Sequence, residues 1–112
     1  VDVGEAINPD GLVNQIEGGA IQATSWTLME AVRFDRSSIT SDTWETYPIL
    51  RFSQVPQVEV EIMARPDQKP MGAGEAAHGP TAAAIANAVF DALGARVRDL
   101  PITRERIIAA MA

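Results

Sequence analysis

The chain has 112 residues, with 9 basic and 15 acidic side chains that give a formal net charge of −6, and it contains 46% apolar residues, one His and no Cys. This length suits a single domain over residues 1–112. The acidic balance disfavours nucleic acid as a partner, and the absence of Cys excludes disulfides and thiolate metal sites. No apolar stretch is long enough to span a membrane and Val1–Glu5 does not resemble a leader, which predicts a soluble protein of the cytoplasm or periplasm.

A long helix is the first clearly predicted element. Asn8 can cap this helix, Pro9 suits its first position, and apolar residues recur at spacings of three or four to about Ala31. Gly18 and Gly19 lie in its interior, where each is less favourable than Ala by up to about 1 kcal/mol. Close packing of a neighbouring element is the commoner explanation of such a pair, and close approach of a ligand to the backbone is the other.

Strands are predicted in the middle of the chain. The apolar residues of Val58–Ile62 alternate with polar residues, which indicates a strand with one buried face and one acidic face. The segments Val1–Val3 and Trp44–Phe52 are further candidates because they alternate or are rich in β-branched and aromatic residues. Residues 64–71 contain two prolines among polar residues, which is typical of a loop.

An alanine-rich helix is predicted next, with Pro80 in its first turn and Gly94 at its end. A short extended link then leads to a last helix that Thr103 can cap. The expected fold class is therefore α+β. It is a small, mostly antiparallel sheet packed against the long N-terminal helix and the alanine-rich C-terminal helix.

The segment Gly72-Ala73-Gly74-Glu75, directly before the alanine-rich helix, holds the best candidate for chemistry. Its two glycines allow a ligand to approach the backbone closely. A carboxylate at Glu75 can act as a general base where a dry, apolar setting raises the pKa of a carboxyl group. The alternative, which spacing alone favours, is a flexible loop whose glutamate simply favours the helix N-terminus.

Three further features have competing interpretations. Gly72–Ala77, with Asp99 about twenty residues later, matches the relaxed dinucleotide fingerprint, but no strand is predicted directly before it. His78 has no second His and no Cys to join it, and no carboxylates are found at metal-ligand spacings, so a loop or surface position is expected and no metal ligand is predicted. Gln15 can offer an amide to the edge of a heteroaromatic ligand, although by itself it is typical of a surface glutamine.

Five motifs follow one another along nearly the whole chain: Asn8-Pro9-Asp10 with the glycine pair of 14–19, Tyr47–Arg51, Gly72–Glu75, Ala84–Ala88 and Leu100-Pro101. In this order they resemble the C-terminal part of the molybdopterin-binding subunit of the xanthine dehydrogenase and aldehyde oxidase family, in its isoquinoline 1-oxidoreductase and nicotinate dehydrogenase branch. The resemblance implies a C-terminal segment of a molybdenum hydroxylase. Such an enzyme oxidises an aldehyde or an N-heteroaromatic compound with oxygen derived from water.

The resemblance also implies a role for each matching residue. Glu75 matches the glutamate that acts as catalytic base, and Gln15 matches a glutamine that contacts the pterin cofactor. Gly72 and Gly74 match the glycines that bring this loop beside the metal. The pair Gly18–Gly19 matches the positions at which the helix and the cofactor approach closely. The metal is held by the pterin, so the protein needs no ligand set of its own.

The implied cofactor is molybdenum-molybdopterin in its cytosine dinucleotide form, with iron–sulfur clusters on a partner subunit or domain. The implied partners are the remainder of the molybdopterin-binding subunit, the iron–sulfur subunit and a small-molecule substrate. The chain alone is expected to be inactive and prone to form homo-oligomers. It departs from the family after Glu75, where a Pro often follows directly. The alternative from another class is a non-catalytic binding or assembly module that uses its apolar helix faces.

Overall fold

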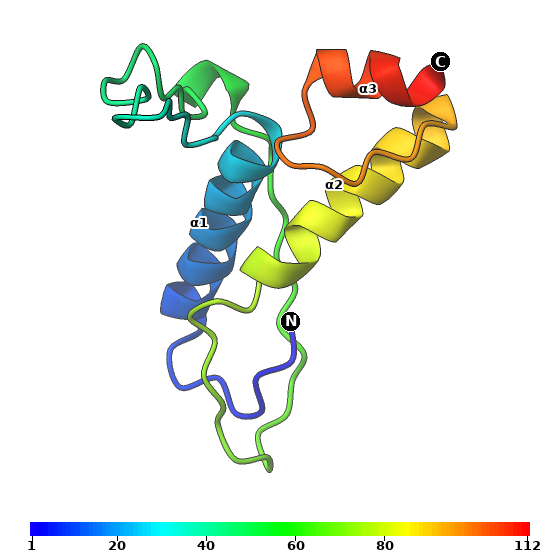
Figure 1. Ribbon diagram of the computed structural model, residues 1–112. Helices are drawn as coiled ribbons and strands as arrows, with labels where there is room; N and C mark the ends of the chain where they lie inside the picture. Colours follow the sequence, from blue (N-terminus) through cyan, green and yellow to red (C-terminus); the bar gives the residue numbers. More distant parts are fainter.

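Three α-helices and one short 3-10 helix are the regular elements of the computed structural model, which describes all 112 residues. They are α1 (Pro9–Leu28), η1 (Phe52–Gln54), α2 (His78–Leu93) and α3 (Arg104–Met111). α1 and α2 pack against each other, and long irregular segments connect the helices (Figure 1). No helix is both long enough and apolar enough to cross a membrane.

The ends of the helices follow the signals in the sequence. The side-chain oxygen of Asn8 accepts a hydrogen bond from Gly11 N–H at 2.9 Å, and this confirms the predicted start of α1. Gly94 adopts a φ of 67° and ends α2, and the Thr103 side chain caps α3, both as predicted. α1 ends at Leu28, slightly earlier than its apolar pattern suggests.

The predicted α+β fold is wrong, because the structure contains no strand and no sheet. Val58–Ile62 is extended, and its apolar side chains are half-buried while its polar ones are exposed, as the alternation indicates. It lacks a continuous partner strand. The only bridge joins Phe34 to Ile39 and is isolated. Within Trp44–Phe52, a turn at residues 44–46 is followed by an irregular stretch that enters η1 at Phe52.

The N-terminal segment shows why no sheet forms. The Val1 carbonyl accepts a hydrogen bond from Met63 N–H at 2.8 Å, whereas the Val3 carbonyl accepts one from Met71 N–H, also at 2.8 Å. These two bonds connect residues that are two apart in the N-terminal segment to residues that are eight apart in the later segment. A ladder needs consecutive pairing along both strands, so the bonds hold the segments together without making a sheet.

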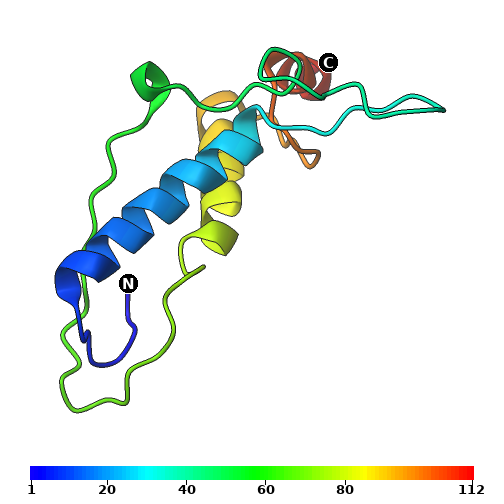
Figure 2. The same ribbon diagram turned by 90° about the vertical axis from the view of Figure 1, so that its left-hand side faces the viewer.

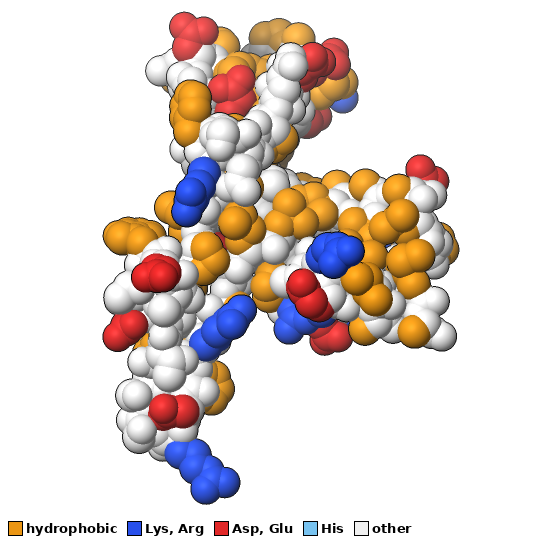
Figure 3. Space-filling model, turned by 90° about the horizontal axis from the view of Figure 1, so that it is seen from above, with side chains coloured by type: hydrophobic (Ala, Val, Ile, Leu, Met, Phe, Trp, Pro, Cys, Tyr) orange, Lys and Arg blue, Asp and Glu red, His pale blue; other side chains and the backbone are white.

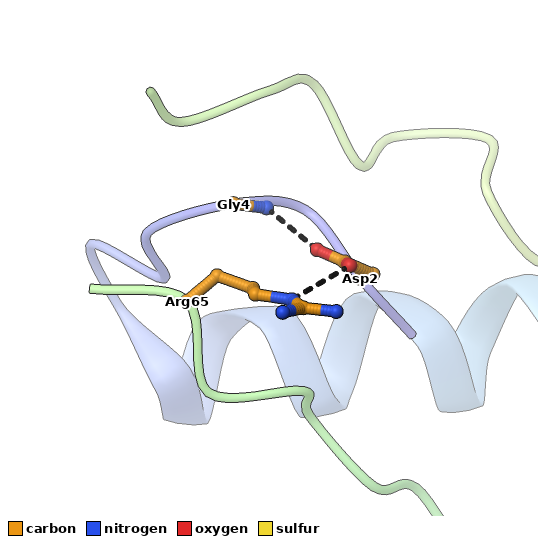
Figure 4. A network of polar contacts seen from close by, with 3 residues as sticks. All are labelled: Asp2, Gly4 and Arg65. Atoms are coloured by element: carbon orange, nitrogen blue, oxygen red, sulfur yellow. Dashed lines mark hydrogen bonds and ion pairs between the residues drawn. The ribbon is translucent and has the colours of Figure 1, made fainter. Parts of the chain in front are cut away.

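A polar cluster fixes the same segment (Figure 4). Asp2 accepts hydrogen bonds from Gly4 N–H at 3.1 Å and from Arg65 Nε at 3.2 Å. The Gly4 N–H, together with the Arg65 guanidinium, lowers the pKa of the Asp2 carboxyl below its ordinary value of 3.8. Gly4 has a φ of 68°, and a Cβ atom at this position would collide with the Lys69 carbonyl. Glycine is therefore required where the N-terminal segment crosses the loop that leads to Gly72.

The chain buries little of its own surface. Only 11 of 112 residues are buried, and large side chains such as Phe52 and Trp44 are 98% and 78% exposed. Figure 2 shows the segment after α1 reaching far out from the helices, and Figure 3 shows hydrophobic side chains gathered on the side that carries α3. The accessible surface is 8235 Å², whereas a compact protein of 12.0 kDa exposes about 6,000 Å².

Candidate functional site

The structure brings the glycine segment 72–75 against the first half of α1. The Gln15 side-chain amide donates a hydrogen bond from Nε2 to the Gly74 carbonyl at 2.7 Å, across 59 residues of sequence. On the other side, the bond from Met71 N–H to the Val3 carbonyl holds the start of the segment. Gln15 therefore lies beside the residue that directly precedes Glu75, although the two are far apart in the sequence.

An open pocket of about 330 Å³ lies at this junction. Its walls come from the N-terminal segment, from the first turns of α1 and from the glycine segment. Their side chains are apolar or amide groups with one carboxylate, and no lysine or arginine lines the pocket. This donor set suits the hydrogen-bonding edge of an uncharged ring better than a phosphate. The lining residues are Val3, Glu5, Ala6, Ile7, Asn8, Gly11, Leu12, Gln15, Pro70, Met71, Ala73 and Gly74.

The glycines of the candidate site fall into two groups. Gly18, Gly72 and Gly74 are exposed, and a Cβ atom on each would meet nothing within 4 Å. Gly19 is buried, and a Cβ atom there would lie 3.3 Å from the Cβ atom of Ala77 at the start of α2. Close packing of the two helices thus accounts for Gly19. Gly18 has no such neighbour and leaves the backbone of α1 open to a ligand.

Glu75 lies two residues before Ala77, the N-cap of α2, and is exposed. Its backbone carbonyl accepts a hydrogen bond from His78 N–H at 3.1 Å. Its carboxylate forms no ion pair, because the single ion pair of the structure joins Arg65 and Asp2. The carboxylate is therefore available as a proton acceptor, although these 112 residues do not supply the dry surroundings that favour a general base.

The sequence suggested a loop or surface position for His78, but the residue is packed against α1. It is the first residue of α2, its ring stacks on Trp26 with 5.2 Å between ring centroids, and its Nε2 lies 3.0 Å from Oε1 of Gln22. Gln22 and Trp26 are four residues apart on α1, so they occupy the same face of that helix. This spacing was a signal for a shared partner, but nothing in the sequence identified His78 as that partner.

The dinucleotide fingerprint lacks its structural context. The residues before Gly72 form an irregular extended segment, and α2 begins only at His78, after a turn. A dinucleotide site of this type needs a strand that runs directly into a glycine turn and a helix.

Comparisons with known proteins show the family of the chain. A family model described as the molybdopterin cofactor-binding domain matches residues 1–56. A nicotinate dehydrogenase subunit of Pseudomonas putida is 50% identical over 110 residues, which is 98% of this chain and 9% of that protein. The isoquinoline 1-oxidoreductase beta chain of Brevundimonas diminuta is 38% identical over 102 residues, which is 91% of this chain and 13% of that protein.

A solved structure gives the same result. Quinoline 2-oxidoreductase from Pseudomonas putida 86 superposes with a TM-score of 0.80 at 30% identity, and the match covers 98% of this chain and 15% of that one. The chain thus spans about a tenth of the length of the curated relatives it matches. Together with the family model, these matches confirm the resemblance carried by the five motifs: the chain belongs to the molybdopterin cofactor-binding domains of the xanthine dehydrogenase family.

Proposed function

We propose that the chain supplies the catalytic base and part of the pterin site of a molybdenum hydroxylase. The observation that carries the proposal is the hydrogen bond from Gln15 to the Gly74 carbonyl, because it joins an amide that lines an open pocket to the residue directly before Glu75. The substrate class is an N-heteroaromatic compound or an aldehyde. Relatives named for nicotinate, isoquinoline and quinoline support the first of these.

The residues in and around the pocket fit a molybdopterin cofactor. Gly74 in its wall, and Gly18 and Gly72 outside the wall, leave open space where other residues carry a Cβ atom, so a flat ligand can reach their backbone. Gln15 uses its Nε2 for Gly74 and has no protein partner on its Oε1, which can accept a hydrogen bond from a pterin N–H group. Gly19 contributes indirectly, because its close contact with Ala77 holds the start of α2, which follows the Glu75 turn, against α1.

The reaction divides between the cofactor and this chain. When bound, the molybdenum cofactor would supply the two-electron redox chemistry. A carboxylate oxygen of Glu75 would accept the proton that the water-derived nucleophile loses as it attacks the electrophilic carbon of the substrate. The remainder of the molybdopterin-binding subunit would cover Glu75 and exclude water, and a partner with iron–sulfur clusters would accept the electrons. The cytosine dinucleotide form of the cofactor is part of the same proposal.

The test is a Glu75→Gln substitution in the intact enzyme that carries this chain. A glutamine has almost the same shape but cannot accept the proton, so kcat should fall by about 100-fold or more while the molybdenum and pterin contents stay unchanged. Substrate turnover and cofactor content are measured on the same preparation. Glu59→Gln, the same change at an exposed residue outside the pocket, is the control and should retain full turnover. Normal turnover of Glu75→Gln would disprove the assignment of the base.

A further inference from the structure

One face of α1 contacts the residues on both sides of Glu75. Gln15, Gly19, Gln22 and Trp26 are spaced by four, three and four residues, so their side chains lie on one stripe of the helix. Gln15 bonds the Gly74 carbonyl at the start of the stripe. Gly19 lies against Ala77 and the His78 ring in the middle, and Gln22 and Trp26 contact His78 at its far end.

The turn that contains Glu75 is closed by its own backbone. Ala76 N–H donates to the Ala73 carbonyl at 3.3 Å, and His78 N–H donates to the Glu75 carbonyl at 3.1 Å. The Glu75 backbone is therefore tied directly to the residue whose ring rests on α1. Glu75 lies between two attachments to the same helix, one through Gly74 and the other through His78.

The His78 side chain is held more tightly than a surface histidine. Its ring stacks on Trp26 at an interplanar angle of 27°, and its Nε2 bonds Gln22 at 3.0 Å. Its Nδ1 is buried and has no hydrogen-bond partner. Burial of a polar atom without a partner is unfavourable, so the ring adopts this orientation at the expense of Nδ1. An apolar ring would stack on Trp26 equally well, so the hydrogen bond to Gln22 is what a histidine adds at this position.

We propose that His78 is a positioning residue for Glu75. The ring, held by Gln22 and Trp26, fixes the first residue of α2, and the bond from His78 N–H to the Glu75 carbonyl transmits this fixed position to the proposed base. The proposal rests on the proposed function, since it explains how the base of that site is oriented. Position matters because a displacement of about 1 Å at a reacting group can lower the rate by 100-fold.

The experiment uses the intact, molybdenum-loaded enzyme with His78→Ala, His78→Phe and Gln22→Ala substitutions. His78→Ala should lower kcat by about 10- to 100-fold with little change in KM, because the base is misplaced while substrate binding is retained. His78→Phe keeps a ring on Trp26 and loses only the bond to Gln22, so it should retain more activity than His78→Ala and should match Gln22→Ala. The double variant His78→Phe with Gln22→Ala should be no slower than either single variant, because each change removes the same hydrogen bond between His78 and Gln22.

A second readout does not depend on turnover. Hydrogen exchange of the peptide that covers residues 72–80 should accelerate in His78→Ala and Gln22→Ala, because the N–H groups of Ala76 and His78 lose their fixed turn. Gln57→Ala is the matched control, since this glutamine is exposed and makes no side-chain hydrogen bond. It should change neither exchange nor kcat.

The outcomes separate this inference from the proposed function. Unchanged kcat and unchanged exchange in Gln22→Ala and His78→Phe would overturn the positioning role, even if Glu75→Gln is inactive. Loss of activity that only parallels loss of bound molybdenum would also overturn it, because a general folding defect would then explain the result. Normal turnover of Glu75→Gln would instead remove the proposed base itself. If His78→Ala does not assemble, Gln22→Ala decides the question.

Discussion

Gly18 and Gly79 are both exposed helical glycines with open space where a Cβ atom would lie. Alanine is the better helix former, so Gly18→Ala and Gly79→Ala should each raise the free energy of unfolding, by at most about 1 kcal/mol. Of these two glycines, only Gly18 is proposed to contact the cofactor. We therefore expect Gly18→Ala to lower the molybdenum content of the intact enzyme and Gly79→Ala to leave it unchanged. Metal analysis of the purified variants measures this, and equal contents would argue against a cofactor contact at Gly18.

Asp2 gives the N-terminal segment a pH dependence. Its pKa is lowered from 3.8 by the Gly4 N–H and by Arg65, so the carboxylate stabilises the folded segment above pH 3.8. This contribution is lost as the pH falls through the lowered pKa of the folded state. An NMR titration of the Asp2 carboxyl carbon in the labelled chain should give a midpoint below 3.8. In Arg65→Ala the midpoint should rise but stay below 3.8, because the Gly4 bond remains.

Single residues were predictable from the sequence where their partners are local. Asn8, Gly94 and Thr103 act on backbone groups within a few residues, so their types alone indicated the helix ends. The family resemblance assigned Gln15 and Gly74 to the same cofactor, but the direct contact between them was not predicted. The position of His78 was missed because its partner Gln22 lies 56 residues away, and no local pattern encodes such a contact.

At the scale of elements, the packing of α1 on α2 depends on the missing side chain at Gly19. A valine there would press on Ala77, whose Cβ atom lies 3.3 Å from the site of a new Cβ atom. Gly19→Val should lower the free energy of unfolding by about 1–3 kcal/mol more than Gly18→Val, which has the same effect on helix propensity but points into open space. Urea unfolding of the two variants measures the difference. Equal midpoints would show that the helix contact adds nothing to stability.

The extended segments show the limit of pattern-based prediction. The alternation in Val58–Ile62 correctly indicated which side chains are covered, but it was also interpreted as evidence for a sheet. Side-chain alternation reports burial, whereas a sheet depends on which backbone lies alongside. Here the carbonyls of Val1 and Val3 accept hydrogen bonds from the N–H groups of Met63 and Met71, which lie eight residues apart, so the apolar side chains are half-buried without a ladder. Nothing local in the sequence separates these two arrangements.

The whole molecule is expanded for its size. Its radius of gyration is 17.1 Å, whereas a compact domain of this length has about 13 Å. The surface in excess of a compact protein is about 2,000 Å², which is the area of a large, stable protein interface. Many of the exposed side chains are large and apolar. These quantities agree with the proposal that the chain works against the remainder of a longer subunit.

The isolated chain should therefore behave as an incomplete assembly. Exposed apolar surface drives association, so we expect the purified 112-residue chain to self-associate, to bind a hydrophobic dye and to have no hydroxylase activity. Light scattering, dye fluorescence and a substrate assay test these three expectations. A monodisperse monomer that does not bind the dye would contradict the role of this surface, and turnover by the chain alone would contradict the need for a larger enzyme.

The stripe on α1 has a consequence for how the chain can vary in length. One residue added between Gln15 and Gln22 would rotate the following part of the helix by about 100°. The amide at Gln15 and the ring at Trp26 would then point in different directions, and Gly74 and His78 could no longer both be held. Insertions and deletions in this stretch would therefore disconnect both ends of the stripe from the residues that flank Glu75 in a single step.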